Sequence, residues 1–328
     1  MAADMLTAYY EQNQDSEKLF KNLYIEKSPS FLTHLNKYNV LKINVQDFLS
    51  SSSNVDEMLS KFQKYIIFDL LDEFTTIRYR DETDIVQVMK DVYAGTHYPF
   101  VILIDEWDCL FREYRQDQEA QRKYLAYMTG ILPIKKYGTH SALNMFTEYS
   151  MINPRGMAEY FGFTESEVKA LCDQYGMSFE ETRAWYDGYE MLVVENGEQK
   201  IRELYSPKSV VEAMRSGIFD NYWNQTETYE ALKMYIQMNF DGLKDAVIRM
   251  LAGERVPINT GTFSNDMTTF ESKDDVLTLL VHLGYLSYHW PDKAVFIPNK
   301  EIAQEYINAI STMDWNEVMD SIRASKKL

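Results

Sequence analysis

The chain has few residues of the kinds that build disulfide frameworks and metal centres. Its 328 residues include two cysteines, Cys109 and Cys172, which lie far apart in the sequence. The five histidines are scattered and show none of the short spacings that zinc ligands share. A disulfide scaffold or a cysteine-based metal site is therefore excluded, and a reducing compartment is favoured.

Positive charge and long apolar runs are also scarce. The 33 Lys and Arg residues are outnumbered by 50 Asp and Glu residues, which gives a net charge of −17. A chain this acidic is poorly suited to binding the phosphate backbone of nucleic acids, so a nucleic acid partner is not expected. No run approaches the ~18 apolar residues of a membrane span, and the N-terminus lacks a signal-peptide core. We therefore expect a cytoplasmic protein without membrane contact.

The most informative stretch is Tyr98-Pro-Phe-Val-Ile-Leu-Ile-Asp105-Glu106-Trp107-Asp108. Its four consecutive aliphatics are typical of a strand covered on both faces of a parallel sheet. Two carboxylates follow at the end of the strand where open α/β sheets bind ligands. The pattern predicts a Walker B element, in which Asp105 holds the Mg²⁺ of a nucleoside triphosphate and Glu106 polarises the attacking water. A buried strand that ends in a solvated acidic turn explains so short a pattern about equally well.

The surrounding stretches predict an α/β fold with a parallel sheet. Apolar spacing indicates helices over 1–10, 55–80 and 84–94, a short helix over 16–24, and a strand over 40–48 before the Asp-Glu strand. Residues 126–133 predict one more strand, with Thr129 at its polar end. A hydroxyl at that position could sense a γ-phosphate, although a structural threonine is at least as common.

From residue 138 to about 254 the sequence predicts mainly helices with aromatic anchors. Thr164-Glu-Ser-Glu167 and Ser178-Phe-Glu-Glu181 both match the capping box that begins a helix, and Pro207 occupies a first helical turn. Trp185-Tyr-Asp-Gly-Tyr189 could form a lid near a nucleotide. An aromatic core plug with Gly188 as the C-cap is the stronger interpretation on physical grounds.

The last compact stretch predicts a helix, a two-stranded hairpin and a second helix. The helix spans 275–284, the two strands span 286–290 and 294–298, and the second helix spans 299–310. This order is that of a winged helix. A tail follows from 311 to 328.

Two motifs are missing from the whole sequence. There is no Gly-x-Ser-x-Gly nucleophile elbow, which disfavours an α/β-hydrolase. There is also no Gly-x-x-x-x-Gly-Lys-[Ser/Thr] loop, whose backbone amides would cradle a triphosphate at a helix N-terminus.

Several segments, taken together and in order, resemble the bacterial AAA-ATPase-like proteins. The segments that carry the resemblance are Val101-Ile-Leu-Ile-Asp-Glu-Trp-Asp108, Ala126-Tyr-Met-Thr-Gly-Ile-Leu-Pro-Ile-Lys-Lys-Tyr137, Glu159-Tyr-Phe-Gly-Phe-Thr-Glu-Ser-Glu-Val168, Trp185-Tyr-Asp-Gly-Tyr189 and Tyr205-Ser-Pro-Lys-Ser-Val210. In that family the phosphate loop ends in Gly-Lys-Thr and runs into a helix similar to residues 1–10. The chain is therefore expected to begin just after that loop. Relatives also commonly carry a nuclease-like domain of the PD-(D/E)XK type after a segment like 315–328, and they have a longer connection between 113 and 126.

The resemblance implies a truncated P-loop ATPase core over 1–137, a helical lid over 138–255 and a winged-helix-like unit over 256–310, before the tail. It gives Asp105 and Glu106 the Walker B roles and Thr129 a sensor-like role, and it places Pro207 near the nucleotide base. The implied cofactors are ATP and Mg²⁺. Without the phosphate loop, most of the backbone donors for a triphosphate are lost, so the chain by itself is not expected to be a competent ATPase.

Two classes of function follow from these observations. The first is a nucleotide-binding AAA-ATPase-like domain. The alternative is a non-catalytic interaction module whose winged-helix unit binds a partner protein or DNA, although the acidic balance and the apolar helix 276–283 disfavour DNA. The sequence leaves open whether the chain is itself an enzyme.

Overall fold

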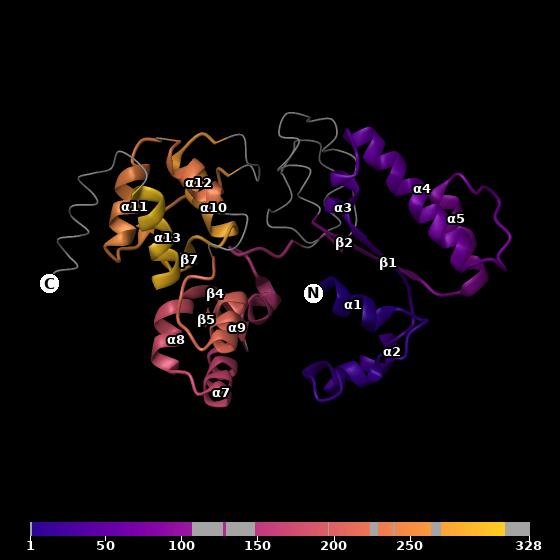
Figure 1. Cartoon of the computed structure of the whole chain (residues 1–328), viewed down its shortest axis with the longest axis horizontal. Helices are drawn as coiled ribbons and strands as arrows, with labels where there is room; N and C mark the ends of the chain where they lie inside the picture. Colours follow the sequence, from indigo (N-terminus) through magenta and orange to yellow (C-terminus); the bar gives the residue numbers. More distant parts are fainter. Residues whose placement is uncertain are drawn as a thin grey trace. The chain divides into compact units, whose positions relative to one another are not determined.

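The structure is a computed structural model that describes residues 2–106, 127–128, 148–195, 197–223, 229–238, 240–263 and 270–311. The chain divides into two compact units, Met1–Ile131 and Leu132–Leu328, which we describe one at a time (Figure 1). The fold class is mixed α/β, as the sequence predicts, with a parallel sheet in the first unit and antiparallel sheets in the second.

A parallel sheet of order β1-β2-β3 organises the first unit. Strand β1 (Asn39–Asn44) pairs along its whole length with β2 (Phe100–Asp105), and β2 pairs with the short β3 (Tyr127–Met128). The register sets Asn44 opposite Asp105. Because the strands are parallel, their carboxyl ends meet at one edge of the sheet, which is where such sheets bind ligands.

Helices cover both faces of this sheet (Figure 1). On one face, α4 (Val55–Glu73) and α5 (Ile85–Thr96) pack on the strands through a core that includes Ile43, Ile104 and Val88. Side chains alternate between the faces of a strand, so Asp105 lies on the opposite face from Ile104. That opposite face is the one on which α1 (Ala2–Tyr10) contacts β1 and β2.

The predicted bounds of two elements in the first unit are wrong. The strand predicted over 40–48 ends at Asn44, whose side-chain oxygen accepts a hydrogen bond from the Gln46 amide (3.0 Å) and begins helix α3 (Val45–Ser50). The helix predicted over 55–80 ends at Glu73. The Tyr79 hydroxyl lies 3.1 Å from the carbonyl oxygens of Leu70 and Phe74, and so satisfies acceptors at the end of the helix.

A small aromatic cluster holds the segment between α1 and β1. The short helix predicted over 16–24 is instead a pair of 3₁₀ turns, η1 (Glu17–Phe20) and η2 (Tyr24–Lys27), followed by α2 (Phe31–His34). The Tyr9 ring lies 5.4 Å from the Phe20 ring and 5.6 Å from the Phe31 ring, measured between centroids. These buried rings anchor the segment to α1.

The first elements in the described part of the second unit are η5 (Arg155–Tyr160), α7 (Glu165–Tyr175) and α8 (Phe179–Tyr186). The capping box predicted at Thr164 forms, and the Glu167 carboxylate accepts a hydrogen bond from the Thr164 amide (2.8 Å). At Ser178 the side chain accepts from the Glu181 amide (3.3 Å), which is half of the predicted box.

An antiparallel hairpin follows α8, where the sequence predicted helical structure. Strands β4 (Tyr189–Glu195) and β5 (Glu198–Leu204) pair along their full length, and α9 (Pro207–Ser216) follows. The apolar side chains at alternate positions of β4 are buried, namely Tyr189, Met191 and Val193, and Glu190 is buried as well. Gly188 is not the C-cap, because Asp187 occupies that position. Gly188 has φ +97°, and a Cβ there would lie 2.2 Å from the Pro298 carbonyl oxygen, so this crossing of two backbones requires glycine.

The described part of the second unit also contains four more helices and a small sheet. The helices are α10 (Tyr229–Ile236), α11 (Leu243–Leu251), α12 (Lys273–His282) and α13 (Lys300–Ser311). The sheet has the order β6-β8-β7, built from Val256–Pro257, Ala294–Phe296 and Ser287–His289. The predicted succession of helix, hairpin and helix is thus present, with every residue of α12 from Asp275 to His282 buried. Among the helices that the structure describes, none combines the length and apolarity needed to cross a membrane.

Candidate functional site

The two carboxylates singled out in the sequence stand where β2 ends and the chain turns away. Both are half-buried, and the Glu106 amide donates a hydrogen bond to Oδ1 of Asp105 (3.2 Å). Glu106 has φ 54°, a left-handed conformation that residues other than glycine adopt rarely and at a cost in energy. The sheet therefore holds Asp105 at its carboxyl edge while a sharp turn sets Glu106 beside it.

The first turn of α1 lies over the same face of the sheet as Asp105. Lys42 of β1 forms an ion pair with Asp4 of α1, and Lys42 stands opposite Leu103 in the strand register. A hydrogen bond from Lys42 lowers the pKa of Asp4 to about 2. The pKa of Lys42 is raised, chiefly by Asp4 and to a smaller extent by Asp105, which places its ammonium group within electrostatic reach of Asp105.

The Asp105 carboxylate at this edge is a hard oxygen ligand of the kind that Mg²⁺ takes in proteins. The residues that the structure describes include no cluster of three or more His, Cys, Asp or Glu side chains that could hold a metal. Magnesium in proteins commonly takes one or two carboxylates and completes its oxygen shell with phosphates and water. Asp105 offers such a carboxylate, and the positive end of the α1 dipole favours negative charge nearby.

Two other predicted site residues are not brought to this edge by the described part of the structure. Thr129 directly follows β3, whose Met128 pairs with Ile104, but Thr129 itself lies outside the described residues. Pro207 belongs to the second unit, where it occupies the first turn of α9 after Ser206, as predicted. Their nucleotide-contacting roles remain predictions.

A charged cluster in the second unit was not anticipated from the sequence. The buried Glu190 of β4 receives a hydrogen bond from Arg255 (Nη2 to Oε1, 2.7 Å) and contacts His289 through its other carboxylate oxygen. Arg255 and His289 also approach Asp292, at 3.6 Å and 3.4 Å. The cluster ties β4 to the β6-β8-β7 sheet, and because its members lie far apart in the sequence no local pattern reveals it.

A second buried carboxylate, that of Glu301, holds residues 221–223 in place. Oε1 of Glu301 accepts hydrogen bonds from the backbone amides of Tyr222 (2.8 Å) and Trp223 (3.0 Å). Burial raises the pKa of Glu301 to about 7 even though these amides favour the ionised form. The neighbouring Glu305, one turn along α13, contacts Asn221. Both glutamates therefore serve to dock this segment on α13.

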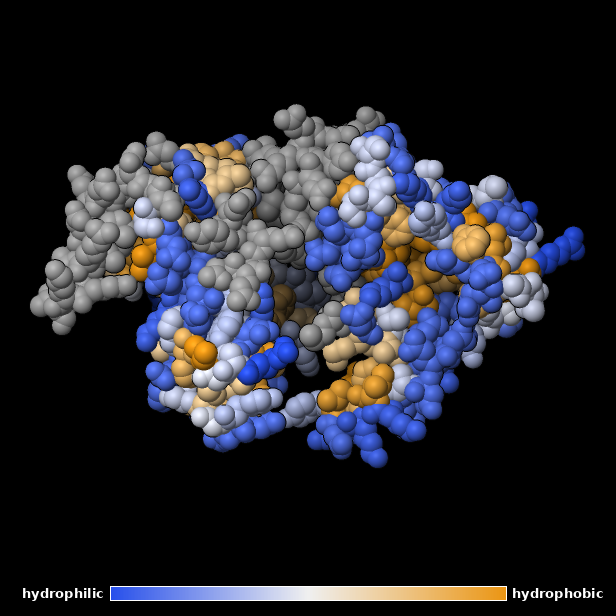
Figure 2. Space-filling view, in the orientation of Figure 1, coloured by the Kyte–Doolittle hydropathy of each residue, from blue (hydrophilic) through white to orange (hydrophobic). Residues whose placement is uncertain are grey.

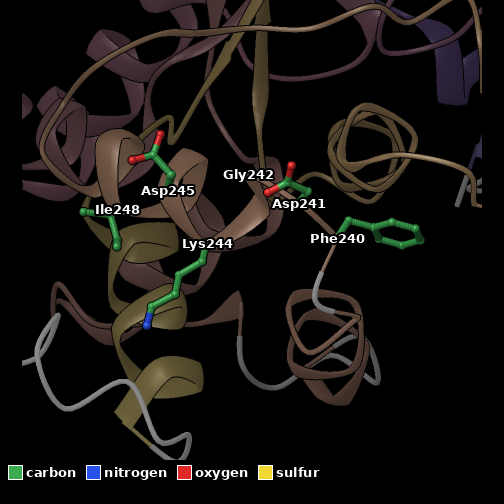
Figure 3. A pocket seen from close by; sticks show the side chains of 6 residues that line it. All are labelled: Phe240, Asp241, Gly242, Lys244, Asp245 and Ile248. Carbon is green, nitrogen blue, oxygen red and sulfur yellow. The ribbon is translucent and has the colours of Figure 1, made fainter.

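A hollow of about 580 Å³ lies at the start of α11 in the second unit (Figure 3). It is lined by Phe240, Asp241, Gly242, Lys244, Asp245 and Ile248, all from one short stretch of chain. In Figure 3 the Lys244 side chain points away from the two carboxylates. None of the predicted site residues lines this hollow.

Comparison with known proteins bears on the first unit. The model of the AAA-ATPase-like family, described as predicted AAA-ATPase, matches residues 1–148. No curated protein and no solved structure matches the chain. The matched range includes the parallel sheet, Asp105, Glu106 and Thr129.

Proposed function

We propose, from the match of residues 1–148 to the model of the AAA-ATPase-like family, that the first unit binds a nucleoside triphosphate with Mg²⁺ at the carboxyl edge of its parallel sheet. The observation that carries the proposal is the position of Asp105. It ends the central strand β2 and lies on the face that α1 covers. Parallel α/β sheets bind ligands at this edge, and a helix N-terminus favours phosphate there.

Each residue of the site has a defined role in this proposal. Asp105 supplies an oxygen ligand to Mg²⁺, which neutralises charge on the phosphates, and Glu106 orients the attacking water. We propose that Thr129 senses the γ-phosphate and that Pro207 contacts the nucleotide base. Asn44 faces Asp105 across the register, but its side-chain oxygen is engaged by the Gln46 amide.

The 328 residues contain no phosphate-binding loop, which limits what this chain can do by itself. Without the loop amides and its lysine, a triphosphate keeps the metal contact and the helix dipole but loses most of its hydrogen-bond donors. The chain should therefore bind MgATP weakly and should not hydrolyse it. Turnover that Glu106→Gln abolished would contradict this.

Thermal unfolding in the presence of nucleotide tests the binding proposal. Millimolar ATP should raise the melting temperature of the wild type when Mg²⁺ is present, because a ligand at about ten times its Kd stabilises by ~1.4 kcal/mol. Asp105→Asn should remove the magnesium-dependent part of the shift. Asp15→Asn, which changes an exposed aspartate in the same unit, should leave it intact. An equal shift of the melting temperature in the wild type and in Asp105→Asn would contradict the proposed site.

The alternative function is an interaction module that uses the winged-helix-like part of the second unit. Its first helix, α12, is buried from Asp275 to His282, so that helix offers no free face for a DNA groove. A protein partner on other surfaces of the unit is the form of this alternative that remains. Salt-dependent retention on a DNA column would revive the DNA form.

A further inference from the structure

The segment between α1 and β1 presents apolar side chains to solvent although it is firmly anchored. Phe20 and Phe31 point inward and are each 4% exposed, whereas Leu19 and Leu32 are 66% and 65% exposed and Tyr24 is 89% exposed. With the half-exposed Leu23 and Ile25, these side chains form what we call the apolar patch: Leu19, Leu23, Tyr24, Ile25 and Leu32. Figure 2 shows hydrophobic residues gathered over the segment that carries α2. Exposed apolar side chains gathered on one segment in this way are a feature of interaction sites.

Three lysines stand among the residues of the apolar patch. Lys18, Lys21 and Lys27 are all exposed, and within the described parts of the chain none of them forms an ion pair. The Lys27 ammonium group lies 5.3 Å from the centre of the Tyr24 ring. One nearby acid, Glu26, is engaged by the backbone amide of Asn22 (2.7 Å). In a chain with a net charge of −17, this surface therefore combines apolar side chains with unpaired positive charge.

The C-terminal half of α4 carries acidic and exposed aromatic side chains on its outer face. Tyr65 and Phe68 are 51% and 66% exposed, and Asp69 and Asp72 are exposed on the same side of the helix. We call these four residues the α4 face. The aspartates form no ion pair within the residues that the structure covers.

The position of these acids does not serve the helix itself. The last turns of α4 contain acidic residues and no basic ones. Negative charge at the C-terminal end of a helix opposes the macrodipole and destabilises the helix. Acidic side chains at this end of α4 destabilise the helix, and exposed aromatic side chains are unfavourable in water. A partner surface with lysines and apolar side chains would neutralise the acids and bury the aromatics.

We propose that the apolar patch of one copy of this chain docks on the α4 face of a second copy. Lys18 and Lys21 then pair with Asp69 and Asp72, while Phe68 packs among the patch leucines. A second copy is the occupant that the structure itself supplies, since the same unit carries a surface that matches the patch in both charge and apolar character. Clustered leucine and aromatic side chains are suited to the core of such an interface, with the ion pairs at its rim.

Both surfaces belong to the first unit, so each copy of the chain carries one of each, which allows a closed dimer. The Asn13 side-chain amide, just before η1, donates a hydrogen bond to Glu73 at the end of α4 (2.8 Å). A two-fold axis would let each copy present its patch to the other copy's α4 face, so that both pairs of surfaces are covered at once.

Sedimentation velocity over a range of protein concentrations tests the proposal. The wild type should change from 38.6 kDa towards twice that mass as concentration rises through the micromolar range. Leu19→Ser with Leu32→Ser should raise the dissociation constant at least about tenfold. Lys18→Glu with Lys21→Glu, or Asp69→Lys with Asp72→Lys, should do the same. Lys90→Glu with Lys300→Glu has the same charge change as the lysine variant at other exposed positions and should associate like the wild type.

Mixing the two charge-reversed variants gives the sharpest result. In a mixed dimer one interface has both charges reversed and the other has both native charges, so association should return in a one-to-one complex. Circular dichroism and the melting temperature establish that each variant is folded. A wild type that stays monomeric throughout, variants that associate normally, or a mixture that stays monomeric would each overturn the proposal. Binding to anionic vesicles without self-association would overturn it in favour of a lipid surface.

Discussion

At the scale of single residues, the raised pKa of the buried Glu301 predicts how the stability of the second unit depends on pH. Glu301 lies inside the second unit with 0% exposure, and its pKa is raised from 4.5 to about 7 by burial. A raised pKa means that the folded chain holds this proton more tightly than the unfolded chain does. The contribution of Glu301 to stability is therefore complete below pH 4.5 and is lost as the pH rises to about 7.

Glu301→Gln should remove that loss because the amide stays neutral and its oxygen can still accept from the Tyr222 and Trp223 amides. The wild type should lose up to about 3 kcal/mol of unfolding free energy across this window relative to the variant. Urea unfolding at a series of pH values measures the difference. Glu180→Gln, at an exposed position on α8, should follow the wild-type curve. Parallel curves for wild type and Glu301→Gln would show that Glu301 does not titrate in this range.

The sequence was sufficient to identify the two site carboxylates, but it did not predict the backbone conformation and the contacts around them. The apolar run and the Asp-Glu pair predicted that Asp105 and Glu106 end a buried strand, and β2 confirms it. Nothing in the sequence indicated the left-handed backbone of Glu106 or the ion pair of Lys42 with Asp4. Both depend on how α1 and the sheet meet, which is a property of the tertiary structure.

At the scale of elements, the sequence predicted secondary structure best where the apolar residues followed a single helical or strand periodicity. The strand before Asp105 and the helices α5, α7 and α8 have clear apolar spacing or caps, and they are confirmed. The run after Asn44 suits a strand or a helix equally, and the asparagine cap decided for a helix. The hairpin β4–β5 was missed although the Asn196-Gly197 dipeptide between alternating residues is a strong hairpin signal.

The junction between α8 and β4 gives a prediction at the scale of elements. Gly188→Ala should destabilise the second unit by more than about 2 kcal/mol, since a Cβ would collide with the Pro298 carbonyl and the positive φ would be strained. Gly176→Ala is the matched control, because Gly176 also has positive φ (+69°) but has no atoms within 4 Å of the added Cβ. It should cost only about 1 kcal/mol. Chemical denaturation compares them, and equal losses would mean that the close approach to Pro298 is unimportant.

At the scale of the whole molecule, chemistry and charge are unevenly distributed along the chain. The strand-edge carboxylates fall in the first unit, all of which lies within the family match, while two buried carboxylates of the second unit, Glu190 and Glu301, hold neighbouring segments together. Although the net charge is −17, Lys18, Lys21 and Lys27 form no ion pair within the described residues. Composition predicted the acidic balance, but only the structure shows which charges are left without partners.

The proposed function depends most on where a metal–nucleotide complex binds, and paramagnetic broadening by Mn²⁺-ATP measures that position directly. In amide NMR spectra of the whole chain, signals from Asn44, Asp105 and their neighbours at the strand ends should broaden first. Asp105→Asn should abolish the effect. If the strand-end signals stayed sharp while those around Lys244 at the hollow beside α11 broadened, the nucleotide site assigned to the first unit would be wrong.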